Sequence, residues 1–391
     1  MIVLGPHHRP TYLAVVGDAN DPITWSGIPY HFLLAARERG LIDEGLNLSL
    51  KGRAWAVRRA LWNALAVAKG RHLGGYQYQP CFLEQLYAPV QQQLLDGVVL
   101  NFFQMFPPSI VAERRIEKHF YIDMTLRQLF ENYGATIDDR TAAEAMERER
   151  EGYEAAALVI THSRWAAQSV IRDYGIAAAR VHTVVPGANL DPLVYAEWAR
   201  KHRGTANVLA GRPLKFVFVG RKWKRKGLDR LLAAFAAARR QGSSATLRII
   251  GFERGWAPAE YRDIEGVEWF GLIDKRRHAA RFLESIAECD VGCLLSRAEA
   301  GGIALREFHA LGLVVIGPAV NGAPEHMIPG ASISIPVTAS DRDIADVMHD
   351  LCHDRSRFQR MREIALHSRR NALWDTAVES ILHFWPHAVD Q

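Results

Sequence analysis

The chain has 391 residues, of which 49% are hydrophobic and 23% are charged, as in an ordinary globular protein. Its 48 basic and 43 acidic residues give a formal net charge of +5, which favours anionic ligands such as nucleotides but is too low for a dedicated nucleic-acid binder. No apolar run approaches the ~20 residues of a membrane-spanning helix, and no signal peptide is visible. With four scattered cysteines, we expect a cytoplasmic protein of at least two domains.

The first half opens with a strand, loop and helix unit. Residues 12–16 are a compact apolar run, a polar loop follows, and residues 28–39 have a helical pattern closed by Gly40. Ligands of α/β proteins bind at the carboxyl ends of parallel strands. The loop is therefore a candidate site, and an ordinary connecting loop is the alternative. Its candidate residues are Asp18, Trp25, Ser26 and Gly27.

The segment 51–72 is basic and aromatic. It holds six Lys and Arg residues and no acidic residue, and Trp55 and Trp62 are spaced to share one helical face. Basic helices with aromatic anchors can lie on an anionic membrane surface. The alternative is a helix of the domain with a solvated basic side.

Asp123 directly follows a predicted strand. Strands are expected at 97–103 and 119–122, and an acid at the end of the second would face the same sheet edge as the first loop. Asp123 is thus a candidate for contacting substrate, and the alternative is the N-cap of a helix that starts at Met124. Further strands at 157–160 and 181–185 complete a βα array.

The second half follows a predicted linker at 201–213. An apolar strand at 215–219 leads into a loop in which five of the six residues 221–226 are basic, and a helix begins directly afterwards. Point charges beside a helix N-terminus suit a diphosphate. The loop is not that of nucleotide hydrolases, because no Ser or Thr follows Lys226. A solvated basic turn is the alternative.

The stretch 294–324 combines acids, glycines and a helix start. A strand ends near Ser296, and a helix beginning near Ile303 would place Glu307 within its apolar stripe. A buried carboxylate needs a partner, either a protein donor or a ligand. The loop from Glu299 to Gly302 and the basic loop should share the carboxyl edge of one sheet. The remaining strands are expected at 247–250, 267–270, 290–295, 314–316 and 333–335.

Three motifs in this order resemble the retaining glycosyltransferases with the GT-B fold, family four or glycosyl transferases group 1. They are the basic loop with its helix at 219–235, the pair Glu299-x7-Glu307, and Asn-Gly-Ala-Pro-Glu at 321–325. The resemblance implies an α/β fold of two Rossmann-like βα domains facing a cleft. We expect an acceptor-binding domain at 1–205, a nucleotide-sugar-binding domain at 206–370, and a C-terminal helix at 371–391 that packs on the first domain.

The resemblance also implies roles for individual residues. Arg221 and Lys226 would neutralise the diphosphate, while Glu299 and Asp123 would contact the donor sugar. Glu307 would accept the ribose hydroxyls. The other donor-binding residues that it implies are Gly27, Leu272, Ile273, Gly301, Gly302 and Ile303, with Leu272 and Ile273 contacting the base through the main chain. Two departures stand out, since Gly301 replaces a usual aromatic residue and Trp25-Ser26-Gly27 replaces a pair of glycines.

The implied activity is hexosyl transfer with retention, by front-face attack and without metal or cofactor, from a nucleoside-diphosphate sugar. The acceptor would be a glycan, a lipid-linked glycan or a small molecule, as in bacterial polysaccharide biosynthesis. No nucleic acid is expected as a partner, and a peripheral position at the inner membrane face would require contact through residues 51–72. The alternatives are a catalytically silent nucleotide-sugar-binding subunit, or a GT-B epimerase or phosphorylase.

Overall fold

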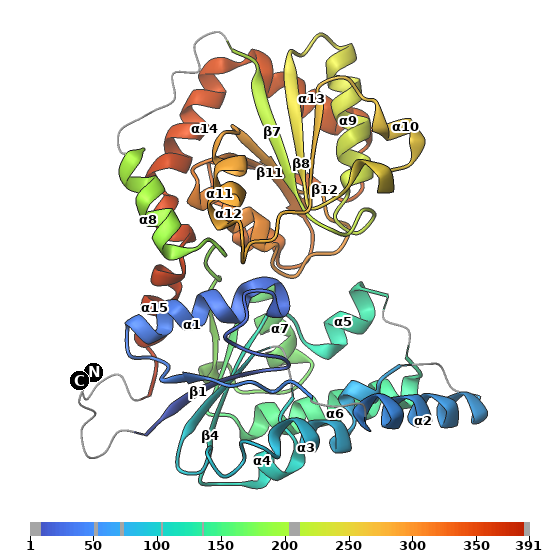
Figure 1. The fold of residues 1–391 in the computed structure, drawn as a ribbon, viewed down its shortest axis with the longest axis vertical. Coiled ribbons are helices and arrows are strands. Elements are labelled where there is room, and N and C mark those ends of the chain that lie inside the picture. The colour runs from blue at the N-terminus through green and yellow to red at the C-terminus, as the bar shows by residue number, and fades with distance from the viewer. Residues whose placement is uncertain are drawn as a thin grey trace. The chain divides into compact units, whose positions relative to one another are not determined.

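The computed structural model describes residues 9–50, 54–70, 74–102, 105–134, 137–202 and 212–386. The chain forms two compact units, each built on one parallel sheet (Figure 1). The first unit comprises Met1–Val185 and Val378–Gln391, and the second comprises Pro186–Ala377. Each unit is an α/β sandwich, as the sequence predicted.

The first unit contains a six-stranded sheet in the order β2-β1-β3-β4-β5-β6, with every neighbouring pair parallel. Its central strands are buried along almost their whole length, which explains why they read as continuous apolar runs. The strands are β1 (Thr11–Val15), β2 (Glu44–Gly45), β3 (Val98–Phe102), β4 (Glu117–Ile122), β5 (Leu158–Thr161) and β6 (Val181–Thr183).

The helices of the first unit cover both faces of this sheet. In Figure 1, α1 lies on one side of it, and α3, α4 and α6 lie on the other. Ser163 caps α7 by accepting from the N–H of Ala166, and Gly175 takes a left-handed conformation just past that helix, both as predicted. The helices are α1 (Ile28–Glu38), α2 (Ala54–Ala68), α3 (Pro80–Tyr87), α4 (Pro108–Ala112), α5 (Leu126–Asn132), α6 (Asp139–Ala155) and α7 (Arg164–Arg172).

The second unit repeats the plan with the strand order β12-β11-β10-β7-β8-β9, again all parallel. Because β10 and β7 are neighbours, the loops that follow these two strands emerge side by side at the carboxyl edge. The strands are β7 (Leu214–Val219), β8 (Ala245–Ile250), β9 (Val267–Gly271), β10 (Val291–Cys293), β11 (Val314–Ala319) and β12 (Ser332–Pro336).

Helices again lie on both faces of the second sheet. Figure 1 shows α9, α10 and α13 on one side and α11, α12 and α14 on the other. None of the helices in the described part of the chain is long and apolar enough to span a bilayer. The helices are α8 (Pro192–Lys201), α9 (Leu228–Arg240), α10 (Ala259–Arg262), α11 (Ala279–Ala287), α12 (Ile303–Ala310), α13 (Asp341–His353), α14 (Arg355–His367) and α15 (Trp374–Leu382).

The chain passes between the units at residues 185–186 and 377–378. The sequence-based boundary at 205–206 gave residues 186–202 to the first domain, whereas they pack in the second unit. The hydroxyl of Tyr195 in α8 donates to the carbonyl of Ala310, and the N–H of Ala188 donates to that of Ala372. Of the predicted linker 201–213, residues 203–211 lie outside the described residues.

The C-terminal helix α15 begins in the second unit and ends in the first. Beyond it, Trp385 packs its ring on His119 of β4, with centroids 4.4 Å apart, and Phe384 stacks on His182 of β6 at 4.0 Å. The helix thus returns to the first unit, as the resemblance implied for the GT-B fold.

Candidate active site

The basic loop after β7 is a tight turn. The N–H of Lys226 donates to the carbonyl of Lys222 at 2.8 Å, and that of Leu228 to the carbonyl of Trp223 at 3.1 Å. Gly227, the first residue before α9, has φ +69°, and a Cβ there would lie 2.0 Å from the carbonyl oxygen of Leu295. Only glycine permits this approach, which brings the loop against the chain that leaves β10.

The loop after β10 is bonded to the basic loop along its length. The N–H of Arg297 donates to the carbonyl of Arg225 at 2.8 Å, and the Arg225 guanidinium donates to the carbonyl of Ala298 at 3.0 Å. Arg297 in turn pairs with Asp229, near the start of α9, at 2.8 Å. The two loops therefore form one structure at the carboxyl edge of the second sheet.

Glu299 lies buried at the centre of this structure. Its Oε2 accepts from Lys226 Nζ at 2.5 Å and from the hydroxyl of Ser296 at 2.8 Å, with Arg225 at 3.5 Å. Burial raises the pKa of Glu299, but the charges of Lys226 and Arg225 outweigh it, and the pKa falls below its usual value. The N–H of Glu299 donates to the side-chain oxygen of Asn321, in the loop after β11. Glu299 is therefore an ionised carboxylate held in place from three loops.

Glu307 has a protein partner that the sequence did not identify. Its side chain is 1% exposed, and its Oε1 accepts from Lys275 Nζ at 2.5 Å. Lys275 follows β9, donates also to the carbonyl of Asn189 at 3.4 Å, and lies over the ring of Phe282. Burial raises the pKa of Glu307 above its usual value, opposed by the charges of Lys275 and of Lys226. Lys226 therefore acts on both glutamates.

Gly301, Gly302 and Ile303 form the start of α12. Gly302 caps the helix in a left-handed conformation, with φ +75°, so the first N–H groups of α12 point out of its N-terminus beside the glycines. At Gly301, a Cβ would meet the imidazole of His326 at 3.1 Å. The buried ring of His326 thus limits the space at the position where the family usually has an aromatic side chain.

Part of the loop after β9 is hydrogen-bonded to, or buried in, the rest of the protein. The N–H of Leu272 donates to the carboxylate of Glu253 at 3.0 Å, and Ile273 is buried in the core, while the Leu272 side chain is exposed. In the loop after β7, near the middle of the sheet, the exposed Arg221 donates no hydrogen bond to the described residues. Its guanidinium is available to an anion in solution.

The first loop of the other unit has an unusual backbone. Trp25, Ser26 and Gly27 all take left-handed conformations, with φ of +47°, +62° and +84°. A Cβ at Gly27 would lie 2.8 Å from the carbonyl oxygen of Pro22. Left-handed conformations cost L-residues about 1–2 kcal/mol each. The loop thus keeps a conformation that glycine usually supplies, although Trp and Ser occupy two of its positions, and such strain is typical of functional sites.

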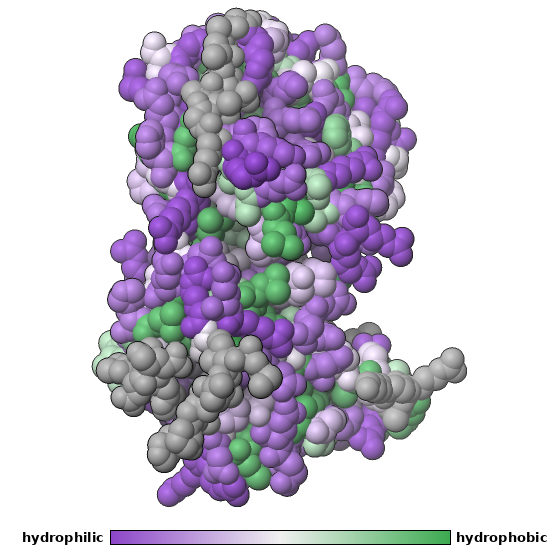
Figure 2. Space-filling model, turned by 60° about the vertical axis from the view of Figure 1, so that its left-hand side comes forward, coloured by the Kyte–Doolittle hydropathy of each residue, from purple (hydrophilic) through white to green (hydrophobic). Residues whose placement is uncertain are grey.

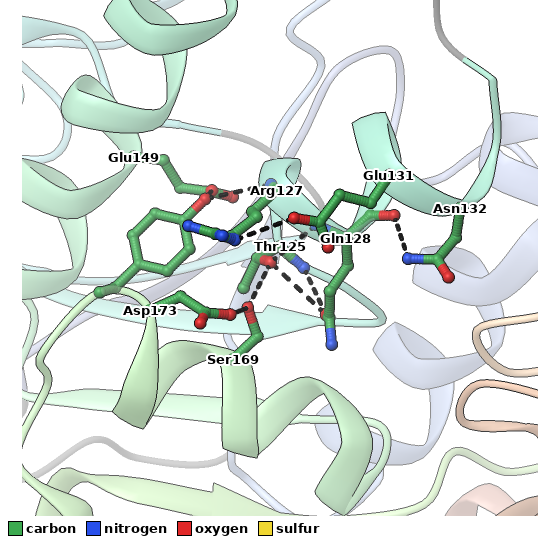
Figure 3. A network of polar contacts seen from close by, with 9 residues as sticks. Thr125, Arg127, Gln128, Glu131, Asn132, Glu149, Ser169 and Asp173 are labelled. Atoms are coloured by element: carbon green, nitrogen blue, oxygen red, sulfur yellow. Dashed lines mark hydrogen bonds and ion pairs between the residues drawn. The ribbon is translucent and has the colours of Figure 1, made fainter.

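Asp123 directly follows β4 but does not cap the next helix. Thr125 caps α5, because its hydroxyl accepts from the N–H of Gln128 and the Gln128 side chain accepts from the N–H of Thr125. Figure 3 shows this capping box beside Ser169 and Asp173 of the next βα unit. Ser169 donates to Asp173 at 2.6 Å, so the Thr125 hydroxyl, 2.8 Å from that of Ser169, must donate to it.

Glu149 of α6 completes the support of the segment after Asp123. Its buried carboxylate accepts from the N–H of Leu126 at 2.9 Å, from the hydroxyl of Tyr153 at 2.8 Å, and from that of Tyr174. Burial raises the pKa of Glu149 to about 7, opposed by these hydrogen bonds. The backbone on the carboxyl side of Asp123 is thus tied to α6 and to the end of α7.

The structure brings together several of the predicted residues and adds others. Lys226, Glu299, Glu307 and the start of α12 lie at one sheet edge, and Asp123 and Gly27 lie at the carboxyl edge of the other sheet. Sequence reasoning missed several partners of these residues. Lys275, Ser296 and Asn321 lie in loops that follow strands and Arg225 is next to Lys226, whereas Glu149, in the middle of α6, gave no such signal.

Known glycosyltransferases are similar to this chain in sequence. Residues 205–367 match the family Glycosyl transferases group 1. A D-inositol 3-phosphate glycosyltransferase from Thermobifida fusca is 24% identical over 235 residues, which cover 58% of this chain and 54% of that protein. The chain thus aligns with about half the length of that relative.

Solved structures share the fold at low identity. Sucrose-phosphate synthase from Thermosynechococcus elongatus superposes with a TM-score of 0.65 at 16% identity, over 97% of this chain and 98% of that one. Anabaena HepE, in complex with UDP and glucose, superposes with a TM-score of 0.59 at 16% identity, over 96% and 99%. The chain has the GT-B fold, and the match to the glycosyl transferases group 1 family lies within its second unit, in agreement with the resemblance that the sequence showed.

Proposed function

We propose that the protein is a retaining glycosyltransferase that uses a nucleoside-diphosphate sugar and needs no metal or cofactor. The observation that carries the proposal is the joining of the basic loop to the loop of Glu299 through the Lys226–Glu299 pair. An ammonium group has three donors, so Lys226 can keep Glu299 and still donate to a phosphate oxygen. HepE, a protein with the same fold, was solved in complex with UDP and glucose, which supports a nucleotide as a ligand of this fold.

Each residue has a distinct part in this proposal. Arg221 and Lys226 neutralise the diphosphate as it departs, which is stabilisation of charge that develops in the transition state. Glu299, ionised and fixed from three loops, orients the donor sugar. Glu307, paired with Lys275, accepts from the ribose hydroxyls. The N–H groups at Gly301, Gly302 and Ile303 bind sugar or phosphate oxygens.

The acceptor is a glycan, a lipid-linked glycan or a small molecule, bound by the first unit. Asp123 and the loop at Gly27 contact the reacting sugars from that unit. Hexosyl transfer of this kind belongs to polysaccharide biosynthesis, and we place the enzyme in the cytoplasm, at the inner face of the membrane when its acceptor is carried on lipid.

The test has a binding step and a turnover step. Free UDP, GDP and ADP are screened for a rise in melting temperature, because a ligand of the native state stabilises it in proportion to occupancy. Transfer is then assayed with sugars of the binding nucleotide, and the anomeric configuration of the product is read by NMR. We expect one nucleotide to bind and the product to retain configuration, and inversion would refute the retaining mechanism.

Variants separate the assigned roles from general damage. Glu299→Ala and Lys226→Ala should each reduce turnover at least ~100-fold, as loss of a transition-state contact does. Lys222→Ala, which removes an exposed cation from the same loop, is the matched control and should keep near-normal turnover. Near-normal turnover of either site variant would refute its role.

The same assays distinguish the other functions of this fold. Nucleotide binding without turnover on any acceptor would indicate a silent subunit. Conversion of the nucleotide sugar without an acceptor would indicate an epimerase, and a requirement for inorganic phosphate would indicate a phosphorylase.

A further inference from the structure

Helix α2 turns an apolar face to solvent. Val57, Leu61 and Leu65, spaced four residues apart, are 56%, 60% and 60% exposed, and Val67 is 55% exposed. The other exposed positions on this face are alanines, at 60, 64 and 68. Most of the surface in Figure 2 is hydrophilic, with hydrophobic residues in small separate patches. In an ordinary α/β unit a helix packs such a stripe against the core, whereas α2 exposes it to solvent.

The opposite face of α2 is fixed to its own unit. The ring of Trp62 packs against Tyr76 with centroids 6.2 Å apart, and the side-chain oxygen of Asn63 accepts from the N–H of Gly74 at 3.3 Å. Ala66 is buried between these contacts. Because they set the rotation of the helix, the apolar face cannot turn inward without breaking them.

Positive charge borders the apolar face. At 100° per residue, Arg58 and Lys69 follow one edge of the stripe, beside Leu65, and both are exposed. Arg59 lies over the ring of Trp55 at 4.8 Å. The segment 51–72 has six basic and no acidic residues, more positive charge than the formal net charge of +5 of the whole chain. The surface that covers α2 must therefore be both apolar and anionic.

We infer that α2 docks on an anionic lipid surface, with Val57, Leu61 and Leu65 at the boundary of headgroups and acyl chains and Arg58 and Lys69 on lipid phosphates. A bilayer containing acidic lipid offers both required chemistries over an area as long as the helix. A second copy of the chain would bring two acid-free cationic helices together, which like-charge repulsion opposes. The inference adds to the proposed function the element that would contact the membrane, and it does not depend on the donor site.

Vesicle flotation with the full chain tests the inference. The protein should float with vesicles of phosphatidylglycerol and phosphatidylcholine at low salt, stay behind with phosphatidylcholine alone, and be released as salt screens the charges. Leu61→Ser/Leu65→Ser should reduce the fraction bound by about 10-fold or more, because the apolar insertion is lost. Leu193→Ser, at an 83% exposed position of α8, is the matched control and should bind as the parent does.

A second pair of variants tests the charge. Arg58→Glu should weaken binding to the anionic vesicles, whereas Arg342→Glu, at an exposed position of α13, should not. Equal binding to neutral and anionic vesicles, or unchanged binding of Leu61→Ser/Leu65→Ser, would overturn the inference. So would a dimer in sedimentation velocity that this double variant abolishes while no vesicles are bound, since α2 would then join two copies.

Failure of the inference can be told from failure of the proposed function. Turnover of a soluble donor and acceptor without vesicles should be the same in the parent and in every α2 variant, because none of these residues belongs to the site. Loss of vesicle binding with normal turnover would show that only the function of α2 is impaired.

Discussion

The buried carboxylate of Glu307, which we propose binds the ribose, depends on a single residue, Lys275, as its partner among the residues that the structure describes. Helix α12 points this carboxylate into the interior, where Lys275 from the loop after β9 pairs with it and opposes the rise in its pKa that burial causes. Breaking a buried pair costs more than the pair contributes, since the remaining charge stays in a poor solvent. Lys275 should thus matter to stability as much as to ligand binding.

A double-mutant cycle tests this at the level of the residue. Lys275→Met should lower the free energy of unfolding by about 3 kcal/mol, because Glu307 is left buried without its cation. Glu307→Gln should cost less, since the Lys275 side chain is 27% exposed and can turn to water. Lys275→Met with Glu307→Gln should recover part of the loss. The measurement is urea denaturation at pH 7.5, and strictly additive single effects would contradict the pairing.

The features of the site that could be predicted from the sequence are those formed by residues close together in the chain. The basic loop, the glycines before α12 and the acids of the Glu-x7-Glu pair are visible as residue types at fixed spacing. The partner of Glu307 is not, because Lys275 reaches it only after β9 and β10 have taken their places in the sheet. The cap of α5 was missed as well, because the sequence offered Asp123 as the alternative N-cap of a helix starting at Met124, whereas Thr125 caps a helix that begins at Leu126.

At the scale of elements, most strands were predictable because they are buried on both faces and read as apolar runs. Strand β2 was not, since its two residues, Glu44 and Gly45, carry no period. The predicted strand at 290–295 is only Val291–Cys293. Asp290, directly before it, uses its carboxylate to accept from the N–H of Lys215 and from Arg212.

A buried network joins three helices of the first unit, and it should make stability depend on pH. The pKa of Glu149 is raised by burial from 4.5 to about 7, so the native state holds a proton there that the unfolded chain releases. The contribution of this proton to stability is complete below pH 4.5 and is lost as the pH rises toward 7. The loss amounts to about 3 kcal/mol.

Glu149→Gln tests this dependence. The difference in free energy of unfolding between the parent and this variant should favour the parent most at pH 5 and shrink by about 3 kcal/mol by pH 8, measured by urea denaturation. Glu151→Gln, at an exposed position of the same helix α6, shows the effect of removing a carboxylate from its surface. An unchanged pH slope in Glu149→Gln would contradict the assignment of the proton.

At the scale of the whole molecule, the first unit is built from two segments that lie far apart in the sequence. The last described residues belong to the first unit, although almost two hundred residues of the second unit, Pro186–Ala377, separate them from it in sequence. Val378 and Ile381 of α15 and the following Trp385 are buried. The C-terminal segment therefore completes the core of a unit that begins at the other end of the chain.

Because the C-terminal segment belongs to the first unit, a substitution in this segment should affect mainly that unit. Trp385→Ala should destabilise the first unit by about 3 kcal/mol, since it removes a buried aromatic ring from His119 of β4. Hydrogen exchange should then speed up at β4 and β6, while β7 and β10 keep their protection and the affinity for the nucleotide is unchanged. His383→Ala, two residues earlier and exposed, should change neither. Equal loss of protection in both sheets would mean that the two units unfold as one body, and that the C-terminal segment supports the second unit as much as the first.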